Sequence, residues 1–321
     1  MQRDAAPSES DVRRLYRSLR LIRRAEEEIA RVYPTDQVKS PVHLSIGQEA
    51  VAVGVCDPLR ADDVVSGTYR GHAAYLAKGG SLKALMAELF GKATGCAAGK
   101  GGSMHLAEMS RYILGTSAVV GTTIPIGLGY ALALKREGGE RVVACFFGDG
   151  ATEEGVFAES LNFAALHKLP VLFVCENNEY AIHTHLSRRW AKEALCERVA
   201  TYGIPATKIA DGDIFAIRAE AAAAYEAIRR GGGPAFIECR TYRWREHVGP
   251  NEDYEAGYRS RDALAAWQAR DQPARLAALI PEAERARIDA EIEHDIAVAL
   301  DFAESSPFPT PDRLLTDVFA P

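Results

Sequence analysis

The feature that most constrains the fold is a series of short, mostly apolar runs separated by helix-like stretches. The four clearest runs, rich in β-branched and aromatic residues, are RVVACFF (141–147), PVLFVCE (170–176), ATKIAD (206–211) and AFIECRTYR (235–243). Strands that are apolar along their length, rather than at alternate positions, are typical of parallel sheets that are buried on both faces. The sequence therefore predicts an α/β fold, in which a parallel sheet carries helices on both faces.

The stretches between and around these runs predict helices. From Asp11 to Tyr33 the apolar residues recur at steps of three and four, which predicts an N-terminal helical arm. The chain from Arg261 onward is rich in Ala, Glu and Arg and predicts a C-terminal helical tail. No internal repeat or low-complexity linker divides the chain, so we expect a single domain over 1–321. The remaining expected helices are 122–137, 152–168, 190–202 and 213–230.

Local signals add three expectations in the first third of the chain. The segment DDVVSGTYRGH reads as a strand ending at Thr68 and Tyr69. A helix is expected in SLKALMAELFG, with Ser81 as its cap and Gly91 as its stop. Five glycines within 91–102 predict a shaped loop rather than a regular element.

Charge and cysteine content exclude several classes of protein. The net charge is −6 and no block is dense in Lys or Arg, so the sequence lacks the footprint of a nucleic-acid or anionic-membrane partner. The six cysteines form no C-x-x-C pair, and we interpret them as reduced thiols of a cytoplasmic protein. The N-terminus lacks the layout of a signal peptide. The weakly polar segment 118–134 is shorter than the roughly 20 apolar residues of a membrane span, and a buried helix is the better interpretation.

Polar residues follow two of the predicted strands at the end where parallel sheets bind ligands. Gly148, Asp149 and Gly150 follow the first strand, and a helix expected from about residue 152 directs its positive end to the same place. That end suits a phosphate, but Asp149 repels one unless a divalent cation lies between them. Magnesium prefers such oxygen ligands, and Asn178 and the carbonyl of Tyr180 follow the adjacent strand.

These residue types also have simpler structural interpretations. A Gly-Asp-Gly turn alone is usually only a tight turn. A dinucleotide-binding motif fails on spacing, because the glycine after Gly148 and Gly150 is at 155 and the motif needs one at 153. Any one of the eight histidines is more often structural than catalytic.

An ordered set of motifs resembles one enzyme family over most of the chain, roughly Leu15 to Tyr258. Gly-Asp-Gly followed by Asn-Asn resembles the signature of thiamine diphosphate enzymes. Within that group the chain is similar to the α subunit of the first component of 2-oxo acid dehydrogenase complexes, of the pyruvate, branched-chain and acetoin type. The motifs are HLSIGQEAVAVGV (43–55), YRGH (69–72), GKGGSMH (99–105), VVGTTIPIG (119–127), GDGATEEG (148–155), ENNEY (176–180) and TYRWREH (241–247).

The resemblance implies a thiamine-diphosphate-binding fold and a role for each matching residue. The implied magnesium ligands are Asp149, Asn178 and, through its carbonyl, Tyr180. The residues implied to hold thiamine diphosphate, with Val120 against its aminopyrimidine, are Tyr69, Arg70, Val120, Gly148, Asp149, Gly150, Ala151, Asn178, Tyr180 and His247. The histidines implied to surround the reacting carbon are His43, His72 and His247. The implied reaction is oxidative decarboxylation of a 2-oxo acid, with the acyl group passing to a lipoyl arm.

The resemblance also implies partners. The glutamate that activates the cofactor lies in a second α/β module, which this chain lacks the length to contain, so a β subunit and an α2β2 assembly are expected. A lipoyl acyltransferase is the further expected partner. A subunit contact is expected on the small residues of PIGLGYALALK, which are Gly127, Gly129, Ala131 and Ala133.

One segment departs from the family pattern and leaves alternatives open. Between His247 and Arg259 there is no serine, so the phosphorylation control of mammalian relatives is absent. The different loop leaves the substrate open and also allows a two-subunit carboligase that works without a lipoyl partner. A structural or regulatory subunit that has lost the chemistry is the remaining alternative.

Overall fold

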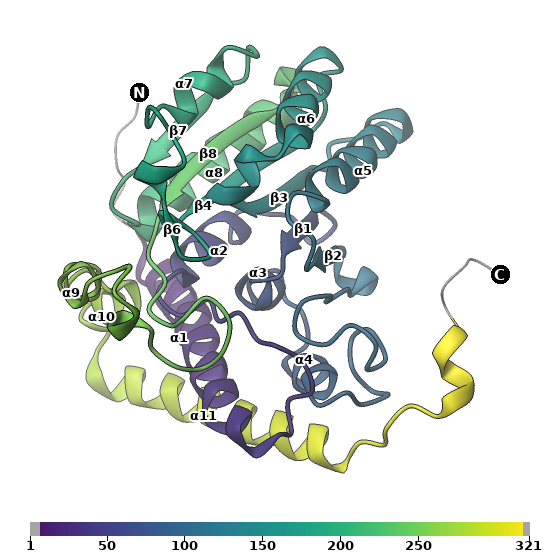
Figure 1. Ribbon diagram of the computed structural model, residues 1–321, viewed down its shortest axis with the longest axis vertical. Helices are drawn as coiled ribbons and strands as arrows, with labels where there is room; N and C mark the ends of the chain where they lie inside the picture. The colour runs from purple at the N-terminus through teal and green to yellow at the C-terminus, as the bar shows by residue number, and fades with distance from the viewer. Residues whose placement is uncertain (1–6, 317–321) are drawn as a thin grey trace.

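The computed structural model describes residues 7–316, and its centre is a six-stranded sheet in which every pair of neighbours is parallel. The strand order is β2-β1-β3-β4-β8-β7, and Figure 1 shows helices packed around the sheet. The predicted α/β fold with a parallel sheet is confirmed. The strands are β1 (Val64–Thr68), β2 (Ile113–Ser117), β3 (Val143–Gly148), β4 (Val171–Asn177), β7 (Ala206–Ile209) and β8 (Ala235–Arg240).

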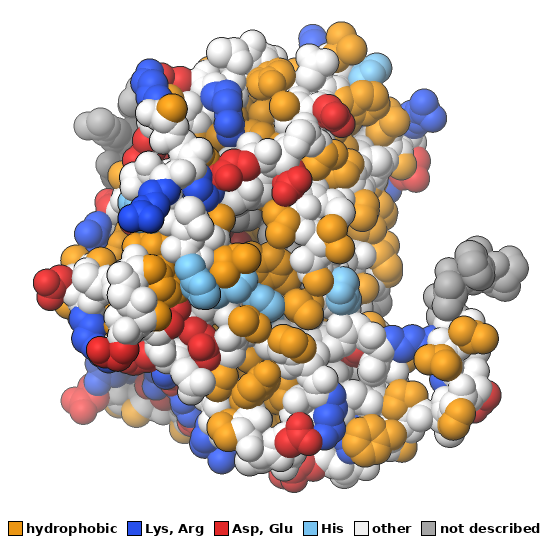
Figure 2. All heavy atoms as spheres, in the orientation of Figure 1, with side chains coloured by type: hydrophobic (Ala, Val, Ile, Leu, Met, Phe, Trp, Pro, Cys, Tyr) orange, Lys and Arg blue, Asp and Glu red, His pale blue; other side chains and the backbone are white. Residues whose placement is uncertain are grey.

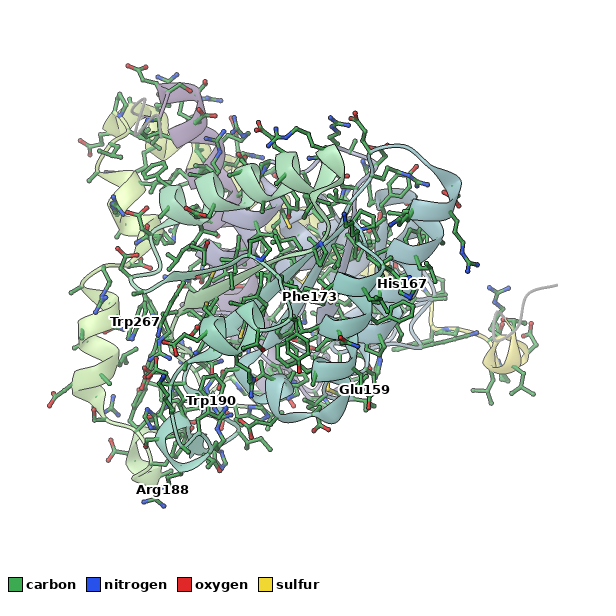
Figure 3. All side chains as sticks on the ribbon, turned by 90° about the horizontal axis from the view of Figure 1, so that it is seen from above. Glu159, His167, Phe173, Arg188, Trp190 and Trp267 are labelled. Atoms are coloured by element: carbon green, nitrogen blue, oxygen red, sulfur yellow. The ribbon has the colours of Figure 1, made fainter. Side chains whose placement is uncertain are left out.

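Successive residues of the central strands enter two different hydrophobic cores. In β3, Ala144 and Phe146 face one core, whereas Cys145 and Phe147 face the other. This alternation explains why the strands are apolar at every position, because each face of the sheet is covered. Figure 3 shows Phe173 of β4 in the interior.

Helices cover the two faces of the sheet as separate layers. One layer contains α5 (Thr123–Glu137), α6 (Gly155–Leu166) and α7 (Leu195–Ala200). The other contains α2 (Glu49–Cys56) and α8 (Ile214–Ala227), with α1 (Glu9–Val32) packed outside them. The remaining helices are α3 (His72–Ala77), α4 (Leu82–Leu89), α9 (Arg261–Gln268), α10 (Gln272–Ala277) and α11 (Glu282–Ser305).

The predicted N-terminal arm and C-terminal tail pack against each other. Helices α1 and α11 lie side by side in Figure 1, at the purple and yellow ends of the colour scale. Their apolar stripes are buried, and ion pairs such as Arg13–Glu284 (2.8 Å) and Arg24–Glu293 (2.6 Å) run along the seam. Exposed pairs of this kind contribute little each, so burial of the apolar stripes holds the two helices together.

The glycine-rich segment forms the expected shaped loop around one buried carboxylate. Glu88 of α4 is fully buried, and its Oε2 accepts the backbone N–H groups of Ala97 (2.8 Å) and Gly99 (2.9 Å). Its Oε1 accepts those of Gly101 (2.7 Å) and Gly102 (3.0 Å). The carboxylate therefore satisfies four backbone donors that no sheet or helix partner reaches.

Some local expectations differ from the structure. The helix expected from 152 begins at Gly155, because residues 149–153 form a tight turn closed by a hydrogen bond from Thr152 Oγ1 to the Asp149 carbonyl (2.8 Å). The helix expected over 190–202 is only α7, and ahead of it Trp190 donates its indole N–H to Glu153 Oε1 (2.9 Å). Strand β2 and the hairpin of β5 (Tyr180–Ala181) and β6 (Thr184–His185) were not expected.

Two further findings concern the cysteines and the possibility of a membrane span. The six cysteines all lie in the described part of the chain and are free thiols. Within residues 7–316, no helix is both long enough and apolar enough to cross a membrane.

Candidate active site

The candidate site lies where the strand order of the sheet reverses. The chain passes from β1 to β2 on one side and then returns to β3 on the other side of β1. The carboxyl ends of β1 and β3 therefore diverge into loops that leave a crevice, as in other doubly wound sheets. A pocket of about 270 Å³ lies there and is lined by residues that follow β1, β3 and β4.

Most residues singled out from the sequence meet in this pocket. His43 borders it without lining it, and His72 lies apart from it. The predicted site residues that line the pocket are Tyr69, Arg70, Val120, Gly148, Asp149, Gly150, Ala151, Asn178, Tyr180 and His247. The structure thus brings together residues that lie far apart in the sequence.

Asp149 is a buried carboxylate at the end of β3. It is 1% exposed, and burial raises its pKa above the ordinary value, an effect that the nearby Arg189 guanidinium opposes. Arg189 forms ion pairs with both Asp149 and Glu153, and its Nε donates to the Thr184 carbonyl (3.0 Å). The backbone N–H of Asn178 also lies close enough to donate to the Asp149 carboxylate, so the ends of β3 and β4 meet at this group.

The two asparagines after β4 have different surroundings. Asn177 Nδ2 donates to the buried carboxylate of Glu238 (2.7 Å), and its Oδ1 accepts from the Glu179 N–H (3.1 Å). Asn178 lines the pocket instead, with Oδ1 accepting from the Tyr180 N–H (3.1 Å). Both asparagines thus close side-chain turns on the backbone two residues ahead, but only Asn178 faces the pocket.

Arg70 is a buried cation for which no carboxylate in the described residues forms an ion pair. It is 6% exposed, and its guanidinium donates to the main-chain carbonyls of Leu44 (2.6 Å) and His247 (3.1 Å). Burial lowers its pKa from the ordinary value, although it remains a cation at neutral pH. A buried charge is costly unless it is paired, so this side of the pocket is suited to an anion.

Three rings form a cluster at the edge of the pocket. His43 lies 4.5 Å from Tyr69 and 5.1 Å from His247 between ring centroids. Burial, together with the cations Arg70 and Arg243, lowers the pKa of both histidines to about 3. Both imidazoles are therefore neutral at physiological pH, and His43 Nδ1 is buried without a hydrogen-bond partner in the described residues. Figure 2 shows histidine side chains gathered near the middle of one face.

His72 has a different environment from the other two predicted catalytic histidines. It is fully buried, with Nδ1 3.1 Å from the Glu26 carboxylate and Nε2 2.9 Å from Ser103 Oγ. The same Glu26 accepts from the backbone N–H of Ser45. These contacts connect α1 to two loops, while the catalytic role of His72 remains a prediction.

Several residues of the site were not found from the sequence. Arg189, Ile182, Gln48 and Glu176 all contact or line the pocket. Burial raises the pKa of the Glu176 carboxyl to about 7. Gln48 and Glu176 lie inside the motifs HLSIGQEAVAVGV and ENNEY, and this position could have identified them as site residues. Arg189 lies in a stretch without a motif, so there was no such indication for it in the sequence.

The donors present fit a magnesium ion with a diphosphate. A carboxylate (Asp149), an amide oxygen (Asn178) and the main chain at Tyr180 surround one end of the pocket, and Mg²⁺ prefers such oxygen ligands. In residues 7–316 no group of three or more His, Cys, Asp or Glu could hold a metal by itself. A cation here would therefore depend on further oxygen atoms from a ligand, and Arg70 provides the matching positive charge for that ligand.

Comparisons with known proteins give matches over most of the chain. The family model described as "Dehydrogenase E1 component" matches residues 17–312. The α subunit of acetoin:2,6-dichlorophenolindophenol oxidoreductase from Bacillus subtilis is 38% identical over 315 residues, which cover 95% of this chain and 92% of that protein. The pyruvate dehydrogenase E1 component α subunits of Zymomonas mobilis (40% identical; 94% of this chain, 87% of that protein) and Rhizobium meliloti (39%; 97% and 90%) are also similar.

Proposed function

Because this chain belongs to the dehydrogenase E1 component family, we propose that it is the α subunit of a thiamine-diphosphate-dependent oxidoreductase acting on a 2-oxo acid or an acetoin-like substrate. The chain forms one domain that holds the diphosphate end of the cofactor through Mg²⁺. The acyl group then passes to the lipoyl group of an acyltransferase. No observation in the structure favours the carboligase alternative.

The observation that carries this proposal is that one pocket contains both a buried cation and a set of oxygen ligands for a metal ion. Among the described residues no carboxylate is paired with the buried cation Arg70. Asp149, one oxygen of which is paired with Arg189, and Asn178 offer oxygen atoms to a cation. A magnesium diphosphate satisfies both, because its phosphate oxygens neutralise Arg70 while its metal takes the oxygen ligands.

The residues of the chain and the cofactor have different roles in the proposed reaction. When bound, thiamine diphosphate supplies the electron sink that makes loss of carbon dioxide from a 2-oxo acid possible. Tyr69, Arg70 and the backbone at Gly150 and Ala151 hold the diphosphate. Gly150 lies against Ala181, where an added Cβ would come within 3.0 Å of the alanine Cβ, so the turn after β3 stays close to the hairpin.

The histidines act as neutral groups in this scheme. His43 and His247 border the pocket with their pKa values lowered to about 3, so each ring offers one N–H donor and one acceptor nitrogen at neutral pH. A neutral imidazole orients polar groups of the substrate through its N–H or its acceptor nitrogen, without adding a third positive charge beside Arg70 and Arg243. His72 supports the loops that carry Ser45 and Ser103.

The partner is a β subunit, and the layer of α5 and α6 provides a surface for it. The relatives are named as α subunits, and this surface exposes Ile126 (54%), Phe163 (40%) and Leu166 (74%). Val119 and Val120 continue the apolar surface to the pocket itself. A β subunit on this surface closes the pocket and contributes the activating glutamate, in an α2β2 assembly.

The expected small-residue contact on α5 needs one correction. Gly129 and Ala133 face outward, but Gly127 and Ala131 are buried against the sheet. A Cβ added to Gly127 would lie 3.0 Å from Ser66 Oγ. Residues two apart on a helix point about 200° apart, so four small residues at alternate positions cannot share one face.

Calorimetry tests the site. Thiamine diphosphate is titrated into the chain purified with its β subunit, with and without Mg²⁺. We expect binding that requires Mg²⁺ and is lost in Asp149→Ala. Binding that is independent of Mg²⁺, or unchanged in Asp149→Ala, contradicts the proposed site.

An activity assay tests the reaction. The loaded αβ enzyme is offered 2-oxo acids and acetoin, with and without a lipoyl domain. We expect turnover that depends on the lipoyl domain or on an artificial electron acceptor. Carbon–carbon bond formation with an added aldehyde, without either acceptor, would instead support the carboligase.

A further inference from the structure

Gln48 lines the pocket but has no role in the site described above. It precedes α2, is 1% exposed, and its side chain makes no capping hydrogen bond to that helix. The preceding Gly47 has φ +93°, and a Cβ there would lie 2.2 Å from Trp244 Cδ1 and 2.5 Å from the Tyr242 carbonyl oxygen. Glycine is therefore required at 47, and the backbone that it permits delivers Gln48 to the pocket.

The contact of Gln48 is with Asn178, the proposed amide ligand of the metal. Asn178 Nδ2 donates to Gln48 Oε1 at 2.8 Å, and both side chains are buried. On the other side, the Tyr180 backbone N–H donates to Asn178 Oδ1 at 3.1 Å. A backbone N–H is only a donor, so the atom of Asn178 that it meets is the oxygen and the atom that meets Gln48 is the nitrogen.

The amide of Gln48 is oriented in the same way. Its Oε1 accepts from Asn178, so its Nε2 is directed elsewhere, and this nitrogen has no hydrogen-bond partner that meets strict geometry in the described residues. The Glu176 carboxylate lies near enough for Gln48 to lower the pKa of that group. The Tyr180 backbone N–H therefore fixes the orientation of the Asn178 amide, Asn178 fixes that of the Gln48 amide, and the Gln48 nitrogen is directed towards Glu176.

We propose that Gln48 is a positioning residue that holds the side-chain amide of Asn178 so that its oxygen, and not its nitrogen, is presented to the metal. The proposal rests on the proposed function, because Asn178 is a ligand only if a cation binds in the pocket. The two ends of an asparagine amide have nearly the same shape, so the shape of the pocket does not select one orientation. Hydrogen-bond partners select it, and Gln48 is the side-chain partner of the nitrogen.

Removal of an orienting residue such as Gln48 is expected to weaken metal binding even though that residue does not contact the metal. Groups that orient a ligand typically change metal affinity by about 10- to 100-fold when they are removed. Gln48→Met keeps the length of the side chain but removes the acceptor for Asn178 Nδ2. An aspartate at 178, in contrast, has two equivalent oxygens and needs no orienting partner.

The test is a double-mutant cycle read by calorimetry. Mg²⁺ is titrated, at saturating thiamine diphosphate, into the chain with its β subunit for the wild type, Gln48→Met, Asn178→Asp and the double variant. We expect Gln48→Met to weaken Mg²⁺ binding by about 10- to 100-fold in the Asn178 background. In the Asn178→Asp background we expect a change of at most about twofold.

Three outcomes overturn the proposal. They are unchanged Mg²⁺ affinity in Gln48→Met, an equal loss in both backgrounds, which signals a general structural effect, and loss of binding in Asn178→Asp alone. Gln48→Ala removes the same acceptor and replaces Gln48→Met if thermal unfolding shows that the methionine variant is not folded. Failure of the proposed function is a separate result, since the wild type would then show no Mg²⁺-dependent binding.

Discussion

At the residue scale, two of the buried arginines, Arg23 and Arg70, have opposite electrostatic surroundings. Arg23 is 5% exposed, forms ion pairs with Glu49 and Asp271, and lies 4.2 Å from the centroid of the Trp244 ring. Arg70 is 6% exposed and donates to main-chain carbonyls, with no carboxylate in the described part of the chain paired to it. Arg23 therefore has a structural role, whereas Arg70 is suited to bind an anionic ligand.

This difference predicts opposite effects of the same substitution. Arg70→Met removes an uncompensated buried charge, so the unfolding free energy of the cofactor-free chain should stay level or rise, while Mg²⁺-dependent cofactor binding weakens by about 2–5 kcal/mol. Arg23→Met leaves Glu49 buried without its partner and should lower the unfolding free energy by about 3–5 kcal/mol. Urea unfolding and calorimetry measure both. Similar destabilisation in the two variants would contradict this assignment of Arg70.

His43 predicts a dependence of stability on pH. Its pKa is lowered to about 3 in the folded chain, against an ordinary value of about 6.5, so the unfolded chain binds more protons between these values. The contribution of a neutral His43 is fully present above pH 6.5 and is lost as the pH falls towards 3. We expect urea unfolding of His43→Gln to vary less than that of the wild type between pH 6.5 and 4.5. Other groups that change protonation in this range, such as Glu176 and His247, are present in both proteins and cancel in the comparison. Parallel curves would show that the ring is not held neutral.

At the element scale, the glycine-rich loop depends on a side chain of α4 rather than on its own sequence. The Glu88 carboxylate accepts four backbone N–H groups of residues 97–102. The loop also supplies Ser103 to His72, so it is continuous with the support of the site. A loop rich in glycine is costly to order, and a single buried acceptor lowers that cost.

The contacts of Glu88 predict that replacing one of its carboxylate oxygens destabilises the glycine-rich loop. Glu88→Gln replaces a carboxylate oxygen by an NH₂ group that faces backbone donors, which should cost about 2–3 kcal/mol of unfolding free energy. Hydrogen exchange at residues 97–102 should accelerate more than exchange in the central strands. Glu159→Gln on the outer face of α6 (Figure 3) is the matched control and should change neither quantity. Slow exchange in the loop of Glu88→Gln would mean that other contacts order it.

At the scale of the whole molecule, the apolar surface of α5 and α6 predicts where the β subunit binds. Leu166→Asp, at a residue that is 74% exposed, should weaken association of the chain with its β subunit without lowering its own thermal stability. Leu279→Asp, at a leucine that is 58% exposed near the end of α10, is the control and should leave association unchanged. Sedimentation of the mixed subunits measures both. Equal association of wild type and Leu166→Asp would place the interface elsewhere.

Sequence patterns alone were sufficient for the layers of this protein and for most of its proposed site. Apolar runs predicted the strands because burial on both faces removes the alternation of polar residues. Asp149 and Asn178 were predicted to meet because parallel strands end at one edge of a sheet, and the matching motifs identified the family. These inferences use only local periodicity and residue type.

Only the tertiary structure decided which groups complete the site. The strand order brings together segments that no local pattern connects. It thereby sets the ion pair of Arg189 with Asp149 and the hydrogen bond of Asn178 to Gln48. It also leaves Arg70 without a carboxylate partner in the described residues. The sequence determines which hydrogen-bonding and charged groups are available. The fold decides which of them are paired, because pairing depends on distance in space. Within residues 7–316, the buried cation that has no paired carboxylate, Arg70, is the group that indicates the ligand.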